Sequence, residues 1–107
     1  MAIDNGRLSL VENRIYYAIF YMVQALALVY DFSTSKHSTL KGWFNKEFVF
    51  TKILASNIYK IYNRAFDKRQ EGDYDDFVKF EKEEVEEDFE KMKKTLEELE
   101  IFIKSKI

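Results

Sequence analysis

Proline is absent from this sequence, and glycine occurs at only three positions, Gly6, Gly42 and Gly72. Folds built from many short strands need frequent tight turns, and those turns depend on glycine and proline. A chain of 107 residues with so few turn-forming residues is therefore not expected to be a β-sandwich or a β-barrel. Its hydrophobic fraction of 47% is enough for a packed core. We predict one all-α domain over residues 1–107.

Apolar residues recur at helical spacing in four segments, which predict helices over about residues 8–31, 40–50, 57–71 and 77–106. The last segment has a heptad seam at Val85, Phe89, Met92, Leu96, Leu99 and Ile103. The polar stretch 33–39 predicts a loop, and Gly72 is expected to end the third helix. Because the connections are short, neighbouring helices should run antiparallel. We predict an antiparallel up-and-down helical bundle of four to five helices.

An uncharged segment of sixteen residues runs from Ile15 to Tyr30. As a helix it would be about 24 Å long at about 1.5 Å per residue, which is shorter than the hydrocarbon core of a bilayer at about 30 Å. The segment also holds four tyrosines and a glutamine, which a lipid-facing helix would rarely contain. We therefore predict a core helix and no membrane association. Since no signal-peptide pattern is visible, we expect a cytoplasmic protein.

Composition excludes several classes of site. No cysteine is present, which excludes a disulfide scaffold, a zinc ribbon and thiol catalysis. The single histidine cannot supply the two Glu-x-x-His motifs of a di-iron bundle, and the acidic run 81–90 is interpreted as a solvated helix face. The sequence also lacks a glycine-rich phosphate loop, a G-x-S-x-G motif and an H-E-x-x-H motif. We expect neither a metal ion nor a cofactor.

Basic and aromatic side chains gather in the middle of the chain. Residues 36–69 hold eight lysine and arginine residues against two acidic ones, although the whole chain has a net charge of −2. The same stretch holds seven aromatic residues: Trp43, Phe44, Phe48, Phe50, Tyr59, Tyr62 and Phe66. Cations among aromatic rings are typical of surfaces that bind single-stranded RNA, because phosphates need positive charge and unstacked bases need rings. The alternative interpretation places the rings in the core and the lysines on solvated helix faces.

Three single residues are candidates for a site. His37 is the one side chain whose unperturbed pKa lies near neutrality, and it falls in the predicted polar loop. It is either a site residue or a capping and surface residue. Arg14 and Arg69 either bind phosphate or form ion pairs with carboxylates at the ends of helices.

Four motifs occur in order along the chain. They are Asn13-Arg14-Ile15-Tyr16-Tyr17-Ala18-Ile19-Phe20, with the pattern N-R-x-Y-Y-A-x-F; Lys36-His37-Ser38; Phe44-Asn45-Lys46-Glu47-Phe48-Val49, with the pattern F-x-x-x-F-V; and Arg69-Gln70-Glu71-Gly72-Asp73-Tyr74, with the pattern R-x-x-x-D-Y. In this order they resemble the signature of small prokaryotic HEPN-domain proteins (higher eukaryotes and prokaryotes nucleotide-binding). The resemblance covers about residues 12–103.

The resemblance implies an antiparallel helical bundle that is usually a homodimer. It implies as partner a minimal nucleotidyltransferase (MNT), encoded beside the HEPN protein in a toxin–antitoxin arrangement. Proteins of this kind usually carry a further helix before the first motif, whereas twelve residues precede it here. One apolar face of the first helix is therefore expected to be covered by a second copy of the chain.

Many HEPN proteins are metal-independent ribonucleases with an arginine and a histidine spaced R-x(4–6)-H, and two such motifs meet at the dimer interface. In that chemistry the histidine acts as acid or base at the ribose 2′-hydroxyl, and the arginine stabilises the charge on the phosphate. Here the corresponding positions after Arg69 hold Tyr74, Asp75 and Asp76 instead of histidine. The resemblance therefore carries over no catalytic histidine from this motif, and His37 would have to replace it.

Three interpretations of function follow. In the first, the chain is a dimeric HEPN module that binds an MNT protein and, through Arg14, Arg69, Asp73 and Tyr74, RNA or a nucleotide. In the second, it is a metal-independent ribonuclease toxin whose catalytic residues are Arg69 and His37. In the third, it is a purely structural helical protein in which Arg69 and Asp73 form a salt bridge at a helix end and Tyr74 is packed. The sequence leaves open whether the chain is an enzyme.

Overall fold

The computed structural model describes residues 5–74 and 79–107, without the side chains of residue 5 and residues 71–74. Its elements are α1 (Asn5–Val29), α2 (His37–Phe44), the π-helical turn η1 (Asn45–Val49), α3 (Ser56–Tyr74) and α4 (Lys82–Lys104). No strand occurs in the described ranges. The prediction of an all-α bundle is therefore confirmed, and the helices lie close to the four predicted segments.

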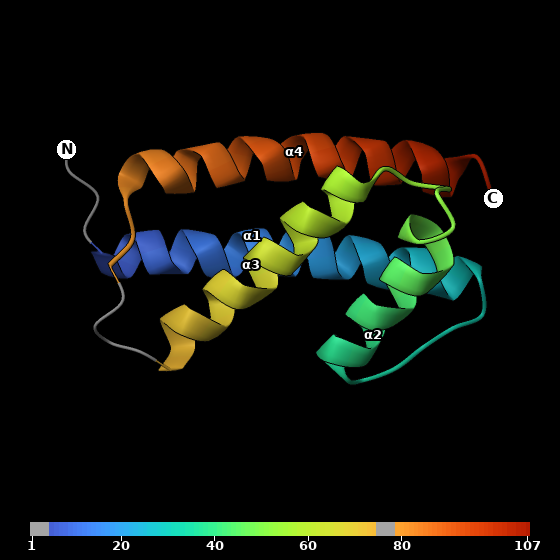
Figure 1. The fold of residues 1–107 in the computed structure, drawn as a ribbon, viewed down its shortest axis with the longest axis horizontal. Helices are drawn as coiled ribbons and strands as arrows, with labels where there is room; N and C mark the ends of the chain where they lie inside the picture. Colours follow the sequence, from blue (N-terminus) through green and yellow to red (C-terminus); the bar gives the residue numbers. More distant parts are fainter. Residues whose placement is uncertain (1–4, 75–78) are drawn as a thin grey trace.

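The first and last helices form the long axis of the molecule. α1 and α4 lie side by side and run in the same direction, whereas α3 crosses them obliquely in the opposite direction (Figure 1). At one end of the α1–α4 pair, Leu8 packs with Val85. At the other end, the rings of Phe48 in η1 and Phe102 in α4 lie edge to face with their centres 5.7 Å apart. The short helix α2 and η1 lie beside the C-terminal half of α1 (Figure 1).

Other helices cover α1 over much of its circumference. Its uncharged stretch is buried on two faces through Ile15, Tyr16, Ile19, Phe20, Val23, Leu26 and Ala27. The core is completed mainly by Leu40, Phe44 and Phe48 from α2 and η1, Ile58 and Tyr62 from α3, and Met92, Leu99 and Ile103 from the heptad seam of α4. This helix is therefore the core helix that its sequence predicts. Among the described helices, none combines the length and the apolarity needed to cross a membrane.

The predicted loop 33–39 is shorter in the structure, because α2 begins at His37. Lys36 takes the N-cap position with an extended backbone (φ −90°, ψ 118°). Its carbonyl accepts a hydrogen bond from the backbone N–H of Leu40 at 3.0 Å. Serine and threonine are tolerated in a first helical turn, since their side chains can remain solvated there. The prediction that His37 lies in a loop is wrong: the first turn of a helix holds it.

No glycine takes the C-cap role at the end of α1 or at the predicted end of α3. α1 is followed by Asp31 in the left-handed region (φ 58°), where the N–H groups of Asp31 and Phe32 bond to the carbonyls of Leu28 and Ala27 at 3.2 and 2.8 Å. This pair of bonds is a Schellman motif, which satisfies the last carbonyls of a helix. Gly72, in contrast, lies inside α3, which continues to Tyr74. The prediction that Gly72 ends the helix is wrong because glycine permits a left-handed turn but does not impose one.

Candidate functional site

A hydrogen bond joins the middle of α1 to the start of α2. The hydroxyl oxygen of Tyr16, a fully buried residue, lies 2.8 Å from Nδ1 of His37. The imidazole ring of His37 stacks on the ring of Phe20 with centres 4.1 Å apart and an interplanar angle of 18°. Tyr17 meets the same imidazole edge to face at 6.0 Å. Three aromatic side chains of one helix therefore fix the position of the single imidazole.

Arg69 approaches the same tyrosines from α3. The central guanidinium carbon lies 5.4 Å from the ring centre of Tyr16 and 5.2 Å from that of Tyr17. Both distances are within the range in which a cation is attracted to the face of an aromatic ring. The structure therefore brings His37 and Arg69 to one pair of rings, although they are on different helices. We call the group of Tyr16, Tyr17, Phe20, His37 and Arg69 the His37–Arg69 site.

Burial sets the protonation states in this site. It lowers the pKa of His37 below its ordinary value, and the positive charge of Arg69 lowers this pKa further. Burial also raises the pKa of Tyr16 to about 12, although the charge of Arg69 acts in the opposite direction. At neutral pH the pair is therefore a neutral imidazole and a neutral phenol. If Nδ1–H of His37 donates to the oxygen of Tyr16, Nε2 is the nitrogen that can accept a proton.

A second cation lies next to the site. Lys41, one helical turn after His37 in α2, places its Nζ 4.2 Å from the ring centre of Phe66 and donates a hydrogen bond to Oδ1 of Asn63. The ring of Phe66 in turn packs edge to face on Tyr16 at 5.8 Å. One positive charge, that of Arg69, thus lies on Tyr16 and Tyr17, and a second, that of Lys41, lies on the adjoining ring of Phe66. Two cations on one group of packed rings suit an anionic group such as a phosphate.

The remaining predicted site residues are Arg14, Asp73 and Tyr74, and none of the described side-chain contacts links them to the His37–Arg69 site. Arg14 is exposed on α1, and among the described side chains no hydrogen bond or ion pair links it to His37 or Arg69. Asp73 and Tyr74 belong to the last turn of α3, one turn beyond Arg69, but their side chains lie outside the described residues. Their predicted roles in binding RNA or a nucleotide stay predictions.

Most aromatic residues of the basic stretch 36–69 belong to the core. Phe44, Phe48 and Tyr62 are buried, and Trp43, Tyr59 and Phe66 are half-buried. Of the seven rings, only Phe50 is exposed, with 82% of its surface accessible. Six of the seven rings therefore fit the interpretation in which they pack inside the bundle. Within residues 5–74 and 79–107, no group of three or more His, Cys, Asp or Glu side chains is placed to hold a metal ion.

Reasoning from the sequence did not single out Tyr16, Tyr17 or Lys41 as parts of a site. The available signal was the pair of adjacent tyrosines in the first motif, inside an otherwise apolar helix. A buried tyrosine usually bonds its hydroxyl to a partner, so Tyr16 pointed to an unknown polar neighbour. For Lys41 the sequence offered only its position one turn after His37.

Comparison with known proteins adds independent evidence. The sequence profile described as "HEPN domain" matches residues 1–102. A protein of Thermotoga maritima named "UPF0332 protein" is 47% identical over 85 residues, which cover 79% of this chain and 64% of that protein. A protein of Methanocaldococcus jannaschii named "Putative toxin MJ0142" is 40% identical over 74 residues, which cover 69% of this chain and 50% of that protein.

These matches extend over most of the chain, and the chain spans between half and about two thirds of the length of the two relatives. No solved structure matches the chain significantly. The profile covers nearly the whole sequence, and its fold is the helical one that the structure has. The chain belongs to the HEPN domain family.

Proposed function

We propose that this chain is the toxin-like HEPN module of a toxin–antitoxin pair and that it binds the phosphate of RNA or of a nucleotide at the His37–Arg69 site. The observation that carries the proposal is the position of Arg69 and His37 on the same two tyrosines, Tyr16 and Tyr17. A guanidinium that already packs on aromatic rings loses little conformational entropy when it forms bidentate hydrogen bonds with a phosphate. The family assignment and the name of the relative from Methanocaldococcus jannaschii support the toxin-like role.

Replacement of Arg69 tests the binding part of this proposal. Arg69→Ala is expected to weaken the binding of a fluorescently labelled single-stranded RNA by about tenfold or more, because a charge-assisted contact to phosphate is lost. Fluorescence anisotropy at fixed ionic strength measures the change. Lys104→Ala, which removes an exposed lysine at the far end of α4, is the matched control and should bind like the wild type. If Arg69→Ala binds RNA as tightly as the wild type does, and also binds a mononucleotide as tightly as the wild type does, the proposed binding site is wrong.

A second candidate function, metal-independent cleavage of RNA, is favoured by the neutral state of His37 beside Arg69. In this mechanism Nε2 of His37 accepts the proton of a ribose 2′-hydroxyl, whose oxygen attacks the adjacent phosphorus. The bond to the 5′-oxygen breaks, the leaving oxygen takes up a proton from water, and a 2′,3′-cyclic phosphate remains. The imidazolium of His37 then returns its proton to the solvent, so that protons balance over the reaction. Arg69 stabilises the additional negative charge on the phosphate oxygens during the attack.

The exposed face of α1 supports a homodimer. Leu10, Tyr21 and Leu28 are 52%, 61% and 66% exposed, and with the half-buried Tyr17 they form a stripe at heptad-related spacing. Exposed apolar stripes of this kind commonly mark protein–protein contacts. A twofold contact through this stripe would bring the His37–Arg69 sites of two copies close together, since Tyr17 belongs to both the stripe and the site.

The double substitution Tyr21→Glu and Leu28→Glu is expected to convert the dimer into a folded monomer, because two carboxylates would be buried at the contact. Light scattering coupled to size exclusion gives the mass, and circular dichroism verifies the helices. Ile101→Glu is the control, since Ile101 is 70% exposed on α4 and lies off the stripe. A monomeric wild type, or a double variant that stays dimeric, would contradict the use of this face.

The partner that we propose is an MNT protein, as the family resemblance implies. In such a pair the antitoxin has to block or modify the toxin-like module, and the His37–Arg69 site is the region where this would be most effective. Co-expression with a minimal nucleotidyltransferase and co-purification of the two chains tests the pairing, and failure of the two chains to co-purify would count against it.

A further inference from the structure

Three carboxylate oxygens are buried without a hydrogen-bond donor among the described residues. They are both oxygens of Glu12 and Oδ2 of Asp88. Glu12 lies on α1 and is 1% exposed, whereas Asp88 lies on α4 and is 7% exposed. Buried acceptors without a partner are rare in native proteins, because the hydrogen bonds that they made to water must be replaced. The two side chains therefore require a donor.

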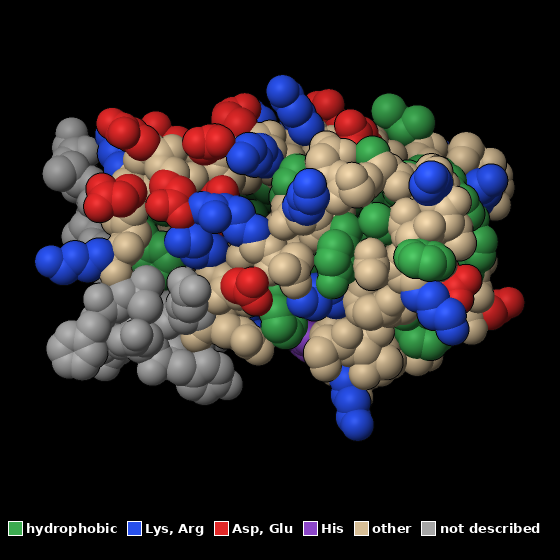
Figure 2. Space-filling view, viewed as in Figure 1, with side chains coloured by type: hydrophobic (Ala, Val, Ile, Leu, Met, Phe, Trp, Pro, Cys, Tyr) green, Lys and Arg blue, Asp and Glu red, His purple; other side chains and the backbone are tan. Residues whose placement is uncertain are grey.

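The neighbouring cations bind other oxygens. Nε of Arg64 in α3 donates to Oδ1 of Asp88 at 2.9 Å, and the terminal nitrogen of the same guanidinium donates to Glu84 in α4. Nζ of Lys68 in α3 lies 2.8 Å from Oε1 of Glu84. Acidic side chains gather over the first half of α4 and basic ones over the facing part of α3 (Figure 2). The positive charges of Arg64 and Lys68 are therefore directed to Glu84 and to one oxygen of Asp88.

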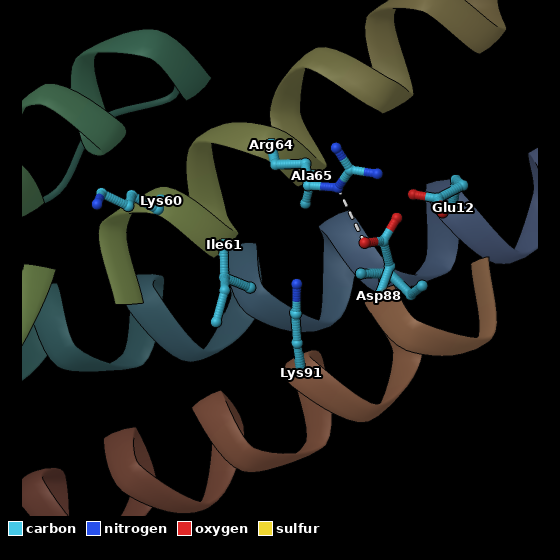
Figure 3. A pocket seen from close by; sticks show the side chains of 8 residues that line it. Glu12, Lys60, Ile61, Arg64, Ala65, Asp88 and Lys91 are labelled. Carbon is cyan, nitrogen blue, oxygen red and sulfur yellow. Dashed lines mark hydrogen bonds and ion pairs between the residues drawn. The ribbon is translucent and has the colours of Figure 1, made fainter. Parts of the chain in front are cut away.

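Glu12 and Asp88 also border a pocket of about 100 Å³, whose remaining charged residues are Lys60, Arg64 and Lys91. Lys91 forms an ion pair with Glu87, 3.0 Å away on its own helix. In the close-up the carboxyl groups of Glu12 and Asp88 lie near each other beside the guanidinium of Arg64 (Figure 3). None of the described cations forms a hydrogen bond or an ion pair with Glu12.

We propose that Glu12 and Asp88 form a carboxyl–carboxylate pair that binds one proton and thereby links α1 to α4. The proton resides on the Glu12 carboxyl, whose O–H donates a hydrogen bond to Oδ2 of Asp88. One proton thus supplies a donor at the place where two acidic side chains face each other. Asp88 keeps its negative charge, which the guanidinium of Arg64 balances.

The electrostatics of the pair agree with this assignment. Burial, together with the hydrogen bond and the charge of the neighbouring Asp88, raises the pKa of Glu12 from its ordinary 4.5 to about 8, although the charges of Lys68 and Arg64 oppose the increase. The folded chain therefore binds the proton more tightly than the unfolded chain does. The stabilisation is fully present below about pH 4.5 and is lost as the pH rises through about 8.

Water in the pocket is the alternative donor. Ordered water could solvate an ionised Glu12, because the pocket is large enough and partly polar. An ionised and hydrated Glu12 would not give the protein a pH-dependent stability in the neutral range. The two explanations are therefore separated by the pH dependence of unfolding.

Urea unfolding of the wild type and of Glu12→Gln between pH 5 and pH 9 tests the proposal. The glutamine amide keeps the shape of the protonated carboxyl and can donate an N–H to Asp88, but it does not titrate. We expect the folding equilibrium constant of the wild type, relative to that of Glu12→Gln, to fall by about a hundredfold or more over this range. Glu97→Gln, at an exposed position of α4, is the matched control and should follow the wild type. Parallel profiles of wild type and Glu12→Gln would overturn the proposal.

A direct measurement needs no variant. Carbon-detected NMR of the wild-type side-chain carboxyls, assigned through the backbone, follows the protonation of Glu12 itself. The proposal requires that Glu12 titrates above neutrality. A titration of Glu12 near its ordinary pKa of 4.5 would refute it even if Glu12→Gln does not fold.

Discussion

His37→Ala is expected to abolish RNA cleavage while leaving RNA binding nearly unchanged. The imidazole supplies the base of the proposed reaction, and a positioned acid or base contributes about 10²–10⁴-fold to a rate. Phosphate binding, in contrast, depends on Arg69 and Lys41, which the substitution leaves in place. A gel assay of a 5′-labelled RNA in the presence of EDTA measures cleavage, and anisotropy measures binding on the same preparation.

Arg69→Ala is the companion variant and should lose both cleavage and binding. If only one of the two variants loses cleavage, the two residues do not act in one site. A wild-type dimer that leaves RNA intact would exclude the ribonuclease function. It would favour the binding module, which requires Arg69 but not the imidazole of His37.

The pH profile of cleavage gives a second test of His37. Because burial lowers the pKa of this imidazole, its neutral and basic form is present at neutral pH and is lost only as the pH falls below the ordinary value of 6.5. The acid limb of the profile is therefore expected below pH 6.5. Tyr16→Phe keeps the ring that faces Arg69 but removes the hydroxyl bonded to Nδ1, so it should reduce cleavage and move this limb. An unchanged limb would show that Tyr16 does not position His37.

Phe44→Ala is expected to lower the free energy of unfolding by about 3–5 kcal/mol, the range found when a buried phenylalanine is truncated. Phe44 is fully buried, and its ring packs against Phe48 and Tyr62 with centres 5.9 and 5.7 Å away. The cavity would lie where α2, η1 and α3 meet. Chemical denaturation followed by circular dichroism measures the change.

Phe50→Ala is the matched control, since Phe50 lies six residues later and is 82% exposed. Its free energy of unfolding should change by no more than about 0.5 kcal/mol, as for other surface substitutions. Similar losses in the two variants would mean that Phe50 is buried in solution, for example against a second copy of the chain.

The helices were predictable because hydrophobic spacing and the lack of turn residues act locally. The positions of their ends were less predictable. Asp31 follows α1 in a left-handed conformation that the sequence does not mark, since glycine is the usual residue there. The heptad seam of α4 indicates which face is covered, but not that the parallel helix α1 covers it. That arrangement depends on how all the helices pack together.

The candidate site was predictable only in part. Two of its residues, His37 and Arg69, could be chosen from their chemistry and from the family motifs. Both residues contact Tyr16, but these contacts depend on how α1, α2 and α3 pack together. The spacing of residues within any one helix does not predict them. Burial of Asp88 was missed for the same reason: it lies in a run of exposed acidic residues, and its partner Arg64 comes from α3.

The pairing of α1 with α4 has a consequence for synthesis on the ribosome. α1 leaves the ribosome before α4, the helix that covers its long face. At about 5–20 residues per second, roughly 4–15 s separate the completion of the two helices. During this interval the apolar surface of α1 has no native cover from α4, so a nascent chain is exposed to chaperones and to other chains. Folding of the bundle therefore has to wait for a late, long-range contact, unlike that of helical proteins in which neighbouring helices pair as they emerge.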